Sequence, residues 1–120
     1  MVDDQPDARD MLQRLLEEAG GRVWVADGAH AALQLMRSTR PHVLVSDIGM
    51  PDVDGYELLR RVRALGPEQG GAVPALALTA FARPQDQQRA LDAGFLAHLS
   101  KPVDPPALIA RLAQLRAAVR

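Results

Sequence analysis

Cysteine is absent from this chain of 120 residues, which excludes disulfides, cysteine-ligated zinc and thiol catalysis. No apolar run reaches the ~20 residues that a membrane-spanning helix requires, and no signal-peptide pattern is present. The formal net charge is only −1, so there is no electrostatic case for direct binding to nucleic acid or to an anionic membrane. These absences favour a cytoplasmic location, and the length and the 48% hydrophobic content predict one domain spanning residues 1–120.

Lysine is almost as scarce, because Lys101 is the only lysine among 14 basic residues. It follows the apolar run 95–99 and precedes Pro102. A second apolar, β-branched run, residues 43–45, leads to Asp47 and then to a loop rich in proline, aspartate and glycine. A strand that ends on a reactive side chain before a turn and a helix is typical of α/β proteins, whose sites lie at the carboxyl edge of the sheet.

Apolar residues at helical spacing alternate along the chain with short apolar or β-branched runs. The spacing predicts helices over residues 6–19, 29–36, 54–65, 85–93 and 104–115. The short runs predict strands over residues 23–26, 42–46, 74–78 and 95–99. Asp104 is expected to cap the last helix, with Pro105 in its first turn. Strands and helices that alternate in this way predict an α/β fold with a parallel sheet covered on both faces.

Polar residues follow four apolar runs: Asp3 and Asp4, Asp47, Thr79, and Lys101. Because the carboxyl ends of parallel strands share one edge of the sheet, we expect these residues to meet in one pocket. Close carboxylates repel one another unless a cation lies among them, and oxygen ligands favour Mg²⁺. Asp47 is then a nucleophile for phosphorus, while Lys101 and Thr79 can bind phosphoryl oxygens. The set predicts formation of an aspartyl phosphate.

These motifs resemble the receiver domain of two-component response regulators. The matching pieces cover nearly the whole chain in order: Val2-Asp3-Asp4, Asp47 through Leu58, Leu78-Thr79-Ala80, Ala93-Gly94 and Lys101-Pro102. The resemblance implies a flavodoxin-like, doubly wound sheet of five parallel strands in the order 2-1-3-4-5, with five flanking helices.

The resemblance also implies what the pocket residues do in signalling. Asp47 would accept a phosphoryl group from a histidine kinase or a histidine phosphotransfer domain, and Lys101 would bind that group. Thr79 and His98 would form the switch that changes the face made by the fourth helix, the last strand and the last helix, where an output partner binds. The chain would change its affinity for a partner rather than turn over a metabolite, and residues 97–104 are similar to receivers of hybrid sensor kinases.

Mg²⁺ is the cofactor that the resemblance implies. Asp4, Asp47 and the main-chain carbonyl of Gly49 would be its protein ligands. Asp3 would act largely through metal-bound water.

Three features depart from the receiver pattern. The switch position is His98, where tyrosine or phenylalanine is common. Gly49 occupies a loop position that often carries a polar side chain, so the approach to the site is expected to be more open. Only Met1 and Val2 precede the acidic pair, so the central first strand is largely missing, and its loss would expose the edges of both neighbouring strands. Either the chain is truncated, or a partner or a second copy fills the gap by dimerisation or strand exchange.

Two other classes of function are open. A degenerate receiver would be a constitutive protein-binding module, and the missing strand keeps that alternative in play. A Mg²⁺-dependent phosphohydrolase with an aspartyl nucleophile usually carries a second acid two residues further on, but that position is Gly49 here. Outside the pocket, turn, helix-cap and solvated-surface roles are expected for Asp52, Asp54, Arg60, Arg61 and Arg63.

Overall fold

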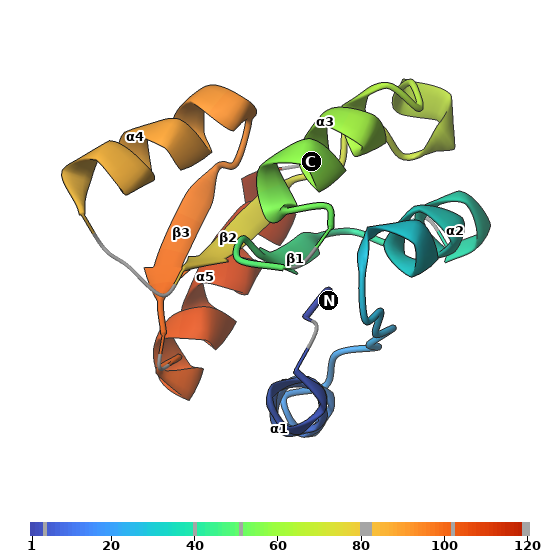
Figure 1. The fold of residues 1–120 in the computed structure, drawn as a ribbon. Coiled ribbons are helices and arrows are strands. Elements are labelled where there is room, and N and C mark those ends of the chain that lie inside the picture. The colour runs from blue at the N-terminus through green and yellow to red at the C-terminus, as the bar shows by residue number, and fades with distance from the viewer. Residues whose placement is uncertain (4, 40, 51, 80–82, 102, 119–120) are drawn as a thin grey trace.

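The computed structural model describes residues 1–3, 5–39, 41–50, 52–79, 83–101 and 103–118. Within these ranges five α-helices and a short 3-10 helix alternate with three strands (Figure 1). In chain order the elements are α1 (Pro6–Glu18), α2 (Ala29–Thr39), β1 (Leu44–Asp47), α3 (Gly55–Arg63), η1 (Pro67–Gln69), β2 (Ala75–Thr79), α4 (Pro84–Ala93), β3 (Ala97–Ser100) and α5 (Pro105–Ala118). The predicted α/β fold with five helices is confirmed.

The three strands form a parallel sheet in the order β1-β2-β3. Val2 adds single parallel bridges to Ala26 and to Ser46, so it lies between the segment around residue 26 and β1. The spatial order of these segments agrees with 2-1-3-4-5. The described residues nevertheless contain three regular strands rather than five, and the strand expected over residues 23–26 is reduced to the bridge at Ala26.

The first-strand segment, residues 1–3, is short but paired on both sides. The Val2 amide donates to the Val45 carbonyl at 2.8 Å, and the Asp47 amide donates to the Val2 carbonyl at 2.9 Å. On the other side, the amide of Asp3 donates to the Ala26 carbonyl at 3.1 Å. Both neighbouring segments are therefore held together over the length of residues 1–3, and the expected exposed edges do not occur there.

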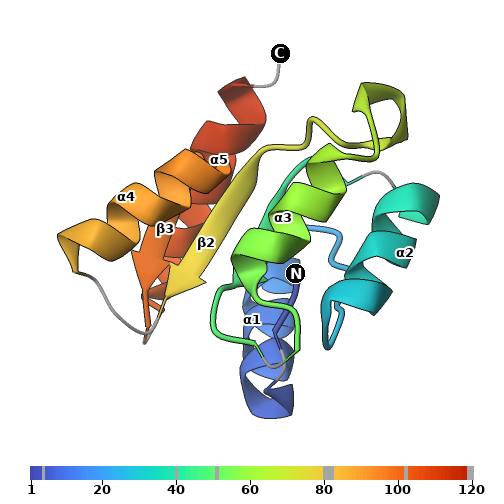
Figure 2. The ribbon, with the colours of Figure 1, turned by 45° about the horizontal axis from the view of Figure 1, so that its top comes forward.

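Helices cover both faces of the sheet, with α2, α3 and α4 on one side and α1 and α5 on the other (Figures 1 and 2). All five residues of β2 are buried, and its side chains alternate between two apolar clusters. Leu76 and Leu78 belong to the cluster that contains Leu12 of α1 and Leu108 of α5. This double burial explains why the strands have continuous apolar sequences rather than alternating ones. Among the described residues, no helix has the length and apolar character to span a bilayer.

The arginines of α3 have two different environments. Arg60 and Arg61 pair with Glu57 at the surface, as expected for a solvated face. Arg63 is partly buried, and it donates hydrogen bonds to three main-chain carbonyls: those of Gly71 at 2.9 Å, Val73 at 2.6 Å and Gly94 at 3.4 Å. The interpretation of Arg63 as a solvated residue is therefore wrong, because the loops around α3 offer it carbonyl groups.

Candidate phosphoacceptor site

Asp47 is the last residue of β1, and its side chain is almost fully buried, at 5% exposure for the residue. The Gly49 amide donates to its Oδ1 at 3.3 Å, and the Ser46 hydroxyl donates to its main-chain carbonyl at 2.9 Å. The turn after the strand is closed by the Gly55 amide, which donates to the Ile48 carbonyl at 2.9 Å. The apolar strand and the loop thus fix the carboxylate at the carboxyl edge of the sheet.

The start of α3 approaches the backbone of Asp47 closely. A Cβ atom at Gly55 would lie 2.5 Å from the Asp47 carbonyl oxygen, so only glycine fits there without displacing the loop. Asp54 caps the helix, since its Oδ1 accepts a hydrogen bond from the Glu57 amide at 2.9 Å. The expected cap role of Asp54 is confirmed. Asp54 and Gly55 together therefore let α3 begin in close contact with the backbone of Asp47.

Asp3 reaches the same edge from the first-strand segment and is completely buried. The Gln5 amide donates to its Oδ1 at 2.9 Å, which leaves Oδ2 directed toward the other site residues. Arg9 of α1 donates to the main-chain carbonyl of Asp3 at 2.9 Å. These two contacts at the start of α1 therefore hold both the carboxylate and the main chain of Asp3 in place.

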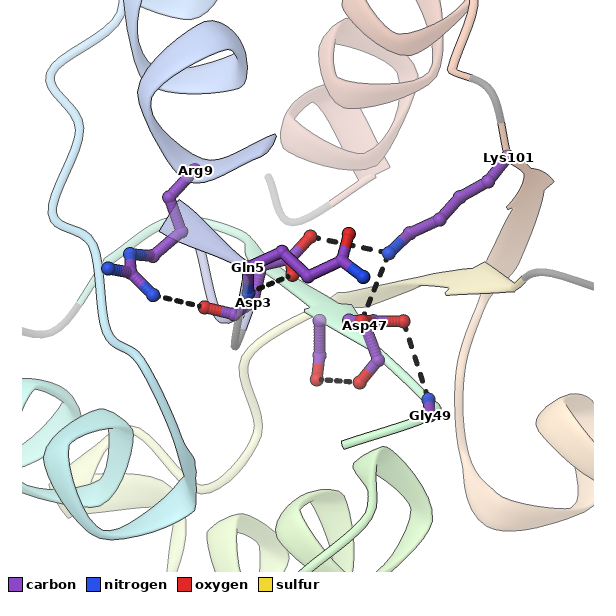
Figure 3. A network of polar contacts seen from close by, with 7 residues as sticks. Asp3, Gln5, Arg9, Asp47, Gly49 and Lys101 are labelled. Carbon is purple, nitrogen blue, oxygen red and sulfur yellow. Dashed lines mark hydrogen bonds and ion pairs between the residues drawn. The ribbon is translucent and has the colours of Figure 1, made fainter. Parts of the chain in front are cut away.

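Lys101 joins the two carboxylates. Its Nζ lies 3.0 Å from Oδ2 of Asp47 and 3.4 Å from Oδ2 of Asp3, as Figure 3 shows. Burial alone would lower the pKa of the Lys101 ammonium, but the hydrogen bonds and the attraction to Asp47 and Asp3 outweigh it and raise the pKa. The ammonium is therefore charged at neutral pH. The structure therefore brings Asp3, Asp47 and Lys101 together at one edge of the sheet, as expected.

Thr79 and His98 lie on the adjoining strands. Thr79 ends β2, is buried, and its carbonyl accepts a hydrogen bond from the Lys101 amide at 2.7 Å. His98 is half-buried on the edge strand β3, in register with Ala77. Because Thr79 is two residues beyond Ala77, Thr79 and His98 belong to the same face of the sheet. A Cβ atom at Gly49 would meet no atom within 4 Å, so the space directly beside this glycine is open.

The residues present suit a hard cation. One carboxylate oxygen of Asp3 and one of Asp47 both lie within 3.4 Å of the Lys101 Nζ atom, so the two carboxylates are close to each other. Such hard oxygen donors are the ligands that Mg²⁺ prefers. Asp4, a predicted ligand, lies outside the described residues. In the part of the chain that is described, no group of three or more acidic, histidine or cysteine side chains could by itself hold a metal ion.

Sequence analysis missed the residues that orient the carboxylates. Ser46 and Arg9 act through main-chain carbonyls, and no motif marks such contacts. The hydrogen bond between the Gln5 amide and Asp3 could have been predicted, because an aspartate side chain commonly accepts a hydrogen bond from the main-chain amide two residues later.

Comparisons with known proteins agree with this geometry. A family model for the response regulator receiver domain matches residues 1–113. The chain is 52% identical over 114 residues to an uncharacterized 14.6 kDa protein from Leptolyngbya boryana, covering 95% of this chain and 85% of that protein. It is 35% identical over 120 residues to sensor histidine kinase RcsC of Salmonella typhi, covering all of this chain but only 12% of the kinase.

A solved structure is similar over nearly the same extent. The receiver domain of the Francisella response regulator 1452 has a TM-score of 0.89 and 28% sequence identity, and the match covers 99% of this chain and 95% of that chain. The chain therefore belongs to the response regulator receiver domain family. Its place is in two-component signalling, where its relatives include both response regulators and sensor kinases.

Proposed function

We propose that the chain is a phosphoacceptor that takes a phosphoryl group on Asp47 from a histidine kinase or a histidine phosphotransfer domain. The observation that carries this proposal is the contact of one ammonium, that of Lys101, with the carboxylates of Asp47 and Asp3 at 3.0 and 3.4 Å. The arrangement combines a nucleophilic carboxylate, a cation for the transferred group and a second acid.

In the proposed reaction an Oδ of Asp47 attacks phosphorus. The new O–P bond forms as the N–P bond of the phosphohistidine donor breaks, and the leaving imidazole nitrogen takes up a proton. Lys101 moves its ion pair from the Asp47 carboxylate to an oxygen of the transferred group, which stabilises the charge in transfer and in the product.

Mg²⁺ would be held by Asp3 through water, by Asp47 and by the Gly49 carbonyl, together with Asp4. When bound, the ion supplies positive charge toward the phosphoryl oxygens. Asp3 is well placed for this role because its Oδ1 is already held by the Gln5 amide while its Oδ2 faces the site.

The switch is proposed to run from Thr79 to His98 and on to the face made by α4, β3 and α5. Leu91 and Leu96 support this proposal, since they are 50% and 57% exposed on α4 and just before β3. Exposed leucines of this kind are suited to contact with a partner. Phosphorylation would change the affinity of this face, and the module would be no metabolic enzyme.

Intact-mass spectrometry after incubation with Mg²⁺ and acetyl phosphate tests the proposal. We expect the mass of one phosphoryl group to be added to the unmodified chain, and no addition to Asp47→Asn. Asp10→Asn is the matched control, because Asp10 lies exposed on α1 and should leave the addition intact. A folded chain that gains no mass would instead support a constitutive protein-binding module. Rapid turnover of the phosphodonor would support a phosphohydrolase.

A further inference from the structure

Arg89 of α4 covers the aromatic ring of Tyr56, the second residue of α3. The Arg89 Cζ atom lies 4.1 Å from the centroid of the ring, well inside the range of a cation–π contact. The same ring makes a T-shaped contact with Phe95, with the two centroids 6.5 Å apart. Phe95 is buried and Arg89 is exposed, so Tyr56 connects the apolar core to a cation at the surface.

The carboxyl end of α4 is held firmly, but the helix has little apolar surface. It lies with α3 on one side of the sheet (Figures 1 and 2). At its carboxyl end the Phe95 amide donates to the Ala90 carbonyl at 3.0 Å, and the Gly94 carbonyl accepts from Arg63 at 3.4 Å. Ala90 is the one buried residue of α4, all of whose residues are described. Apolar packing alone therefore gives the rest of α4 a weak hold on α3.

Two polar side-chain contacts of α4 are local. The Arg83 Nε atom donates to Oδ2 of Asp86 at 3.0 Å, and the Gln88 side-chain amide donates to Asp92 at 2.9 Å. Such contacts between residues three or four positions apart stabilise the helix itself, but they do not determine where it lies. The cation–π contact, by contrast, reaches from α4 to α3 and therefore acts on the position of the helix.

Tyr56 is closely connected to the backbone of the candidate phosphoacceptor. It follows Gly55, whose amide donates to the Ile48 carbonyl at 2.9 Å. A Cβ atom at Gly55 would lie 2.5 Å from the Asp47 carbonyl oxygen, so the first turn of α3 packs directly against that backbone. A displacement of the Asp47 backbone would therefore be transmitted to the Tyr56 ring.

The groups around the ring suit a contact that can open. Partial burial raises the pKa of the Tyr56 phenol, and the charge of Arg89 opposes that rise. Asp86 and Asp54 raise the pKa further, so the phenol is neutral at neutral pH. The attraction thus depends on the face of the ring rather than on a phenolate. Because Arg89 is exposed, water can replace the ring as its neighbour.

We propose that Arg89 and Tyr56 form a clasp, a contact that opens and closes, which couples the backbone of Asp47 to the position of α4. The closed clasp favours the position of α4 in this structure, and a shift at the start of α3 opens it. The clasp itself rests on the contacts between the two helices, whereas its use in signalling rests on the proposed phosphorylation of Asp47. An exposed cation–π contact changes an equilibrium between two helix positions by about two- to fivefold.

Three variants test the clasp. Arg89→Met removes the cation and keeps most of the aliphatic length, and Arg89→Lys restores a cation. Arg61→Met is the charge-matched control, because Arg61 is an exposed arginine of α3 that pairs with Glu57. Tyr56 is the only tyrosine of the chain, so isotope-labelled tyrosine gives a single set of ring signals in NMR spectra.

Without phosphorylation, we expect Arg89→Met to shift the Tyr56 ring signals and to speed amide exchange along α4 by about two- to fivefold. Arg89→Lys should return the exchange rates toward those of the unmodified chain, and Arg61→Met should leave both measurements unchanged. Equal exchange rates along α4 in Arg89→Met and in the unmodified chain would overturn the clasp.

The coupling to Asp47 is tested after incubation with Mg²⁺ and acetyl phosphate, with the added mass verified for each chain. Phosphorylation should speed exchange along α4 in the unmodified chain and have a smaller effect in Arg89→Met, where the clasp is already open. An equal effect in both chains would overturn the coupling. A folded chain that gains no mass would overturn the proposed function and the signalling role together, while the unphosphorylated variants would still decide whether the clasp exists.

Discussion

At the scale of single residues, the site depends on one ammonium between two buried carboxylates. Lys101 lies 98 positions from Asp3 along the chain, yet the ion pairs of Lys101 with Asp3 and Asp47 are both within 3.4 Å. Two buried carboxylates this close would repel each other strongly in a medium of low dielectric constant. The ammonium therefore compensates the charge of the two carboxylates, and under the proposed function it would turn to the transferred phosphoryl group.

Replacing Lys101 by methionine keeps the aliphatic stem and removes the charge. Lys101→Met should lower the free energy of unfolding by about 1–3 kcal/mol, less than for a fully buried pair because a quarter of the side chain is exposed. A more negative site should also bind Mg²⁺ more tightly, by roughly tenfold at the effective dielectric constant of a protein surface. The measurement is Tm as a function of Mg²⁺ concentration, with binding read as thermal stabilisation.

Lys101→Arg is the control for that experiment, since it keeps the charge and should keep a dependence on Mg²⁺ close to that of the unmodified chain. An equal Mg²⁺ dependence for Lys101→Met would contradict the idea that ammonium and metal ion share the same carboxylates.

At the scale of elements, Arg63 connects α3 to the loop before β2 and to the turn after α4. Its guanidinium accepts no hydrogen bonds itself and donates to the carbonyls of Gly71, Val73 and Gly94. Two of these carbonyls lie just before β2, and the third follows α4. Burial lowers the pKa of the Arg63 guanidinium, yet it remains a cation that holds the amino end of β2 and the carboxyl end of α4 against α3.

Arg63→Met should therefore cost about 1–3 kcal/mol of unfolding free energy, because the three carbonyls lose their donor in a partly buried setting. Arg61→Met is the matched control on the same helix. Arg61 is exposed, and within the described part of the chain its ion pair is with Glu57, so its loss should cost less than ~0.5 kcal/mol. Urea denaturation of the two variants gives the comparison, and similar costs for both would show that the contacts of Arg63 contribute little.

The position of Arg63 also shows where prediction from sequence ends. The meeting of Asp3, Asp47 and Lys101 could be predicted, because parallel strands place their carboxyl ends on one edge whatever the loops do. The cap at Asp54 could be predicted because it is local. The buried role of Arg63 could not, since its acceptors lie in loops whose positions depend on the whole fold.

The strand expected over residues 23–26 differs for a related reason. A regular strand depends on the partner available to it as well as on β-propensity. Among the described residues, the first-strand segment contacts this stretch at Ala26 and at the Trp24 carbonyl. The β-branched pattern of Val23 and Val25 predicted a strand over residues 23–26, and that prediction is wrong because the pairing of this stretch is limited to these contacts.

At the scale of the whole molecule, the first-strand segment joins the two halves of the sheet. Val2 is 1% exposed and belongs to the apolar cluster on the α2 and α3 side. Its main-chain hydrogen bonds to Val45 and Asp47 connect the centre of the fold to β1, the strand that carries Asp47. Any free-energy cost at the amino terminus is therefore a cost to the stability of the whole fold rather than a local fraying.

The buried amine of Met1 gives the 120-residue chain a pH-dependent stability. The unfolded amine keeps its proton up to a pKa of 8.0, whereas desolvation lowers the folded pKa to about 6. Between these values the unfolded state binds more protons, so the free energy of unfolding should rise as pH increases from 6 to 8. The two-unit difference corresponds to at most ~2.7 kcal/mol over that window.

Urea denaturation at pH 6 and pH 8 measures this rise. The control is the same chain acetylated at the Met1 nitrogen, which has no amine to titrate but keeps the three histidines and every other ionisable group. Subtracting the two pH profiles isolates the amine, and the difference should grow as pH falls from 8 to 6. Parallel profiles would mean that the amine is solvated in the folded state.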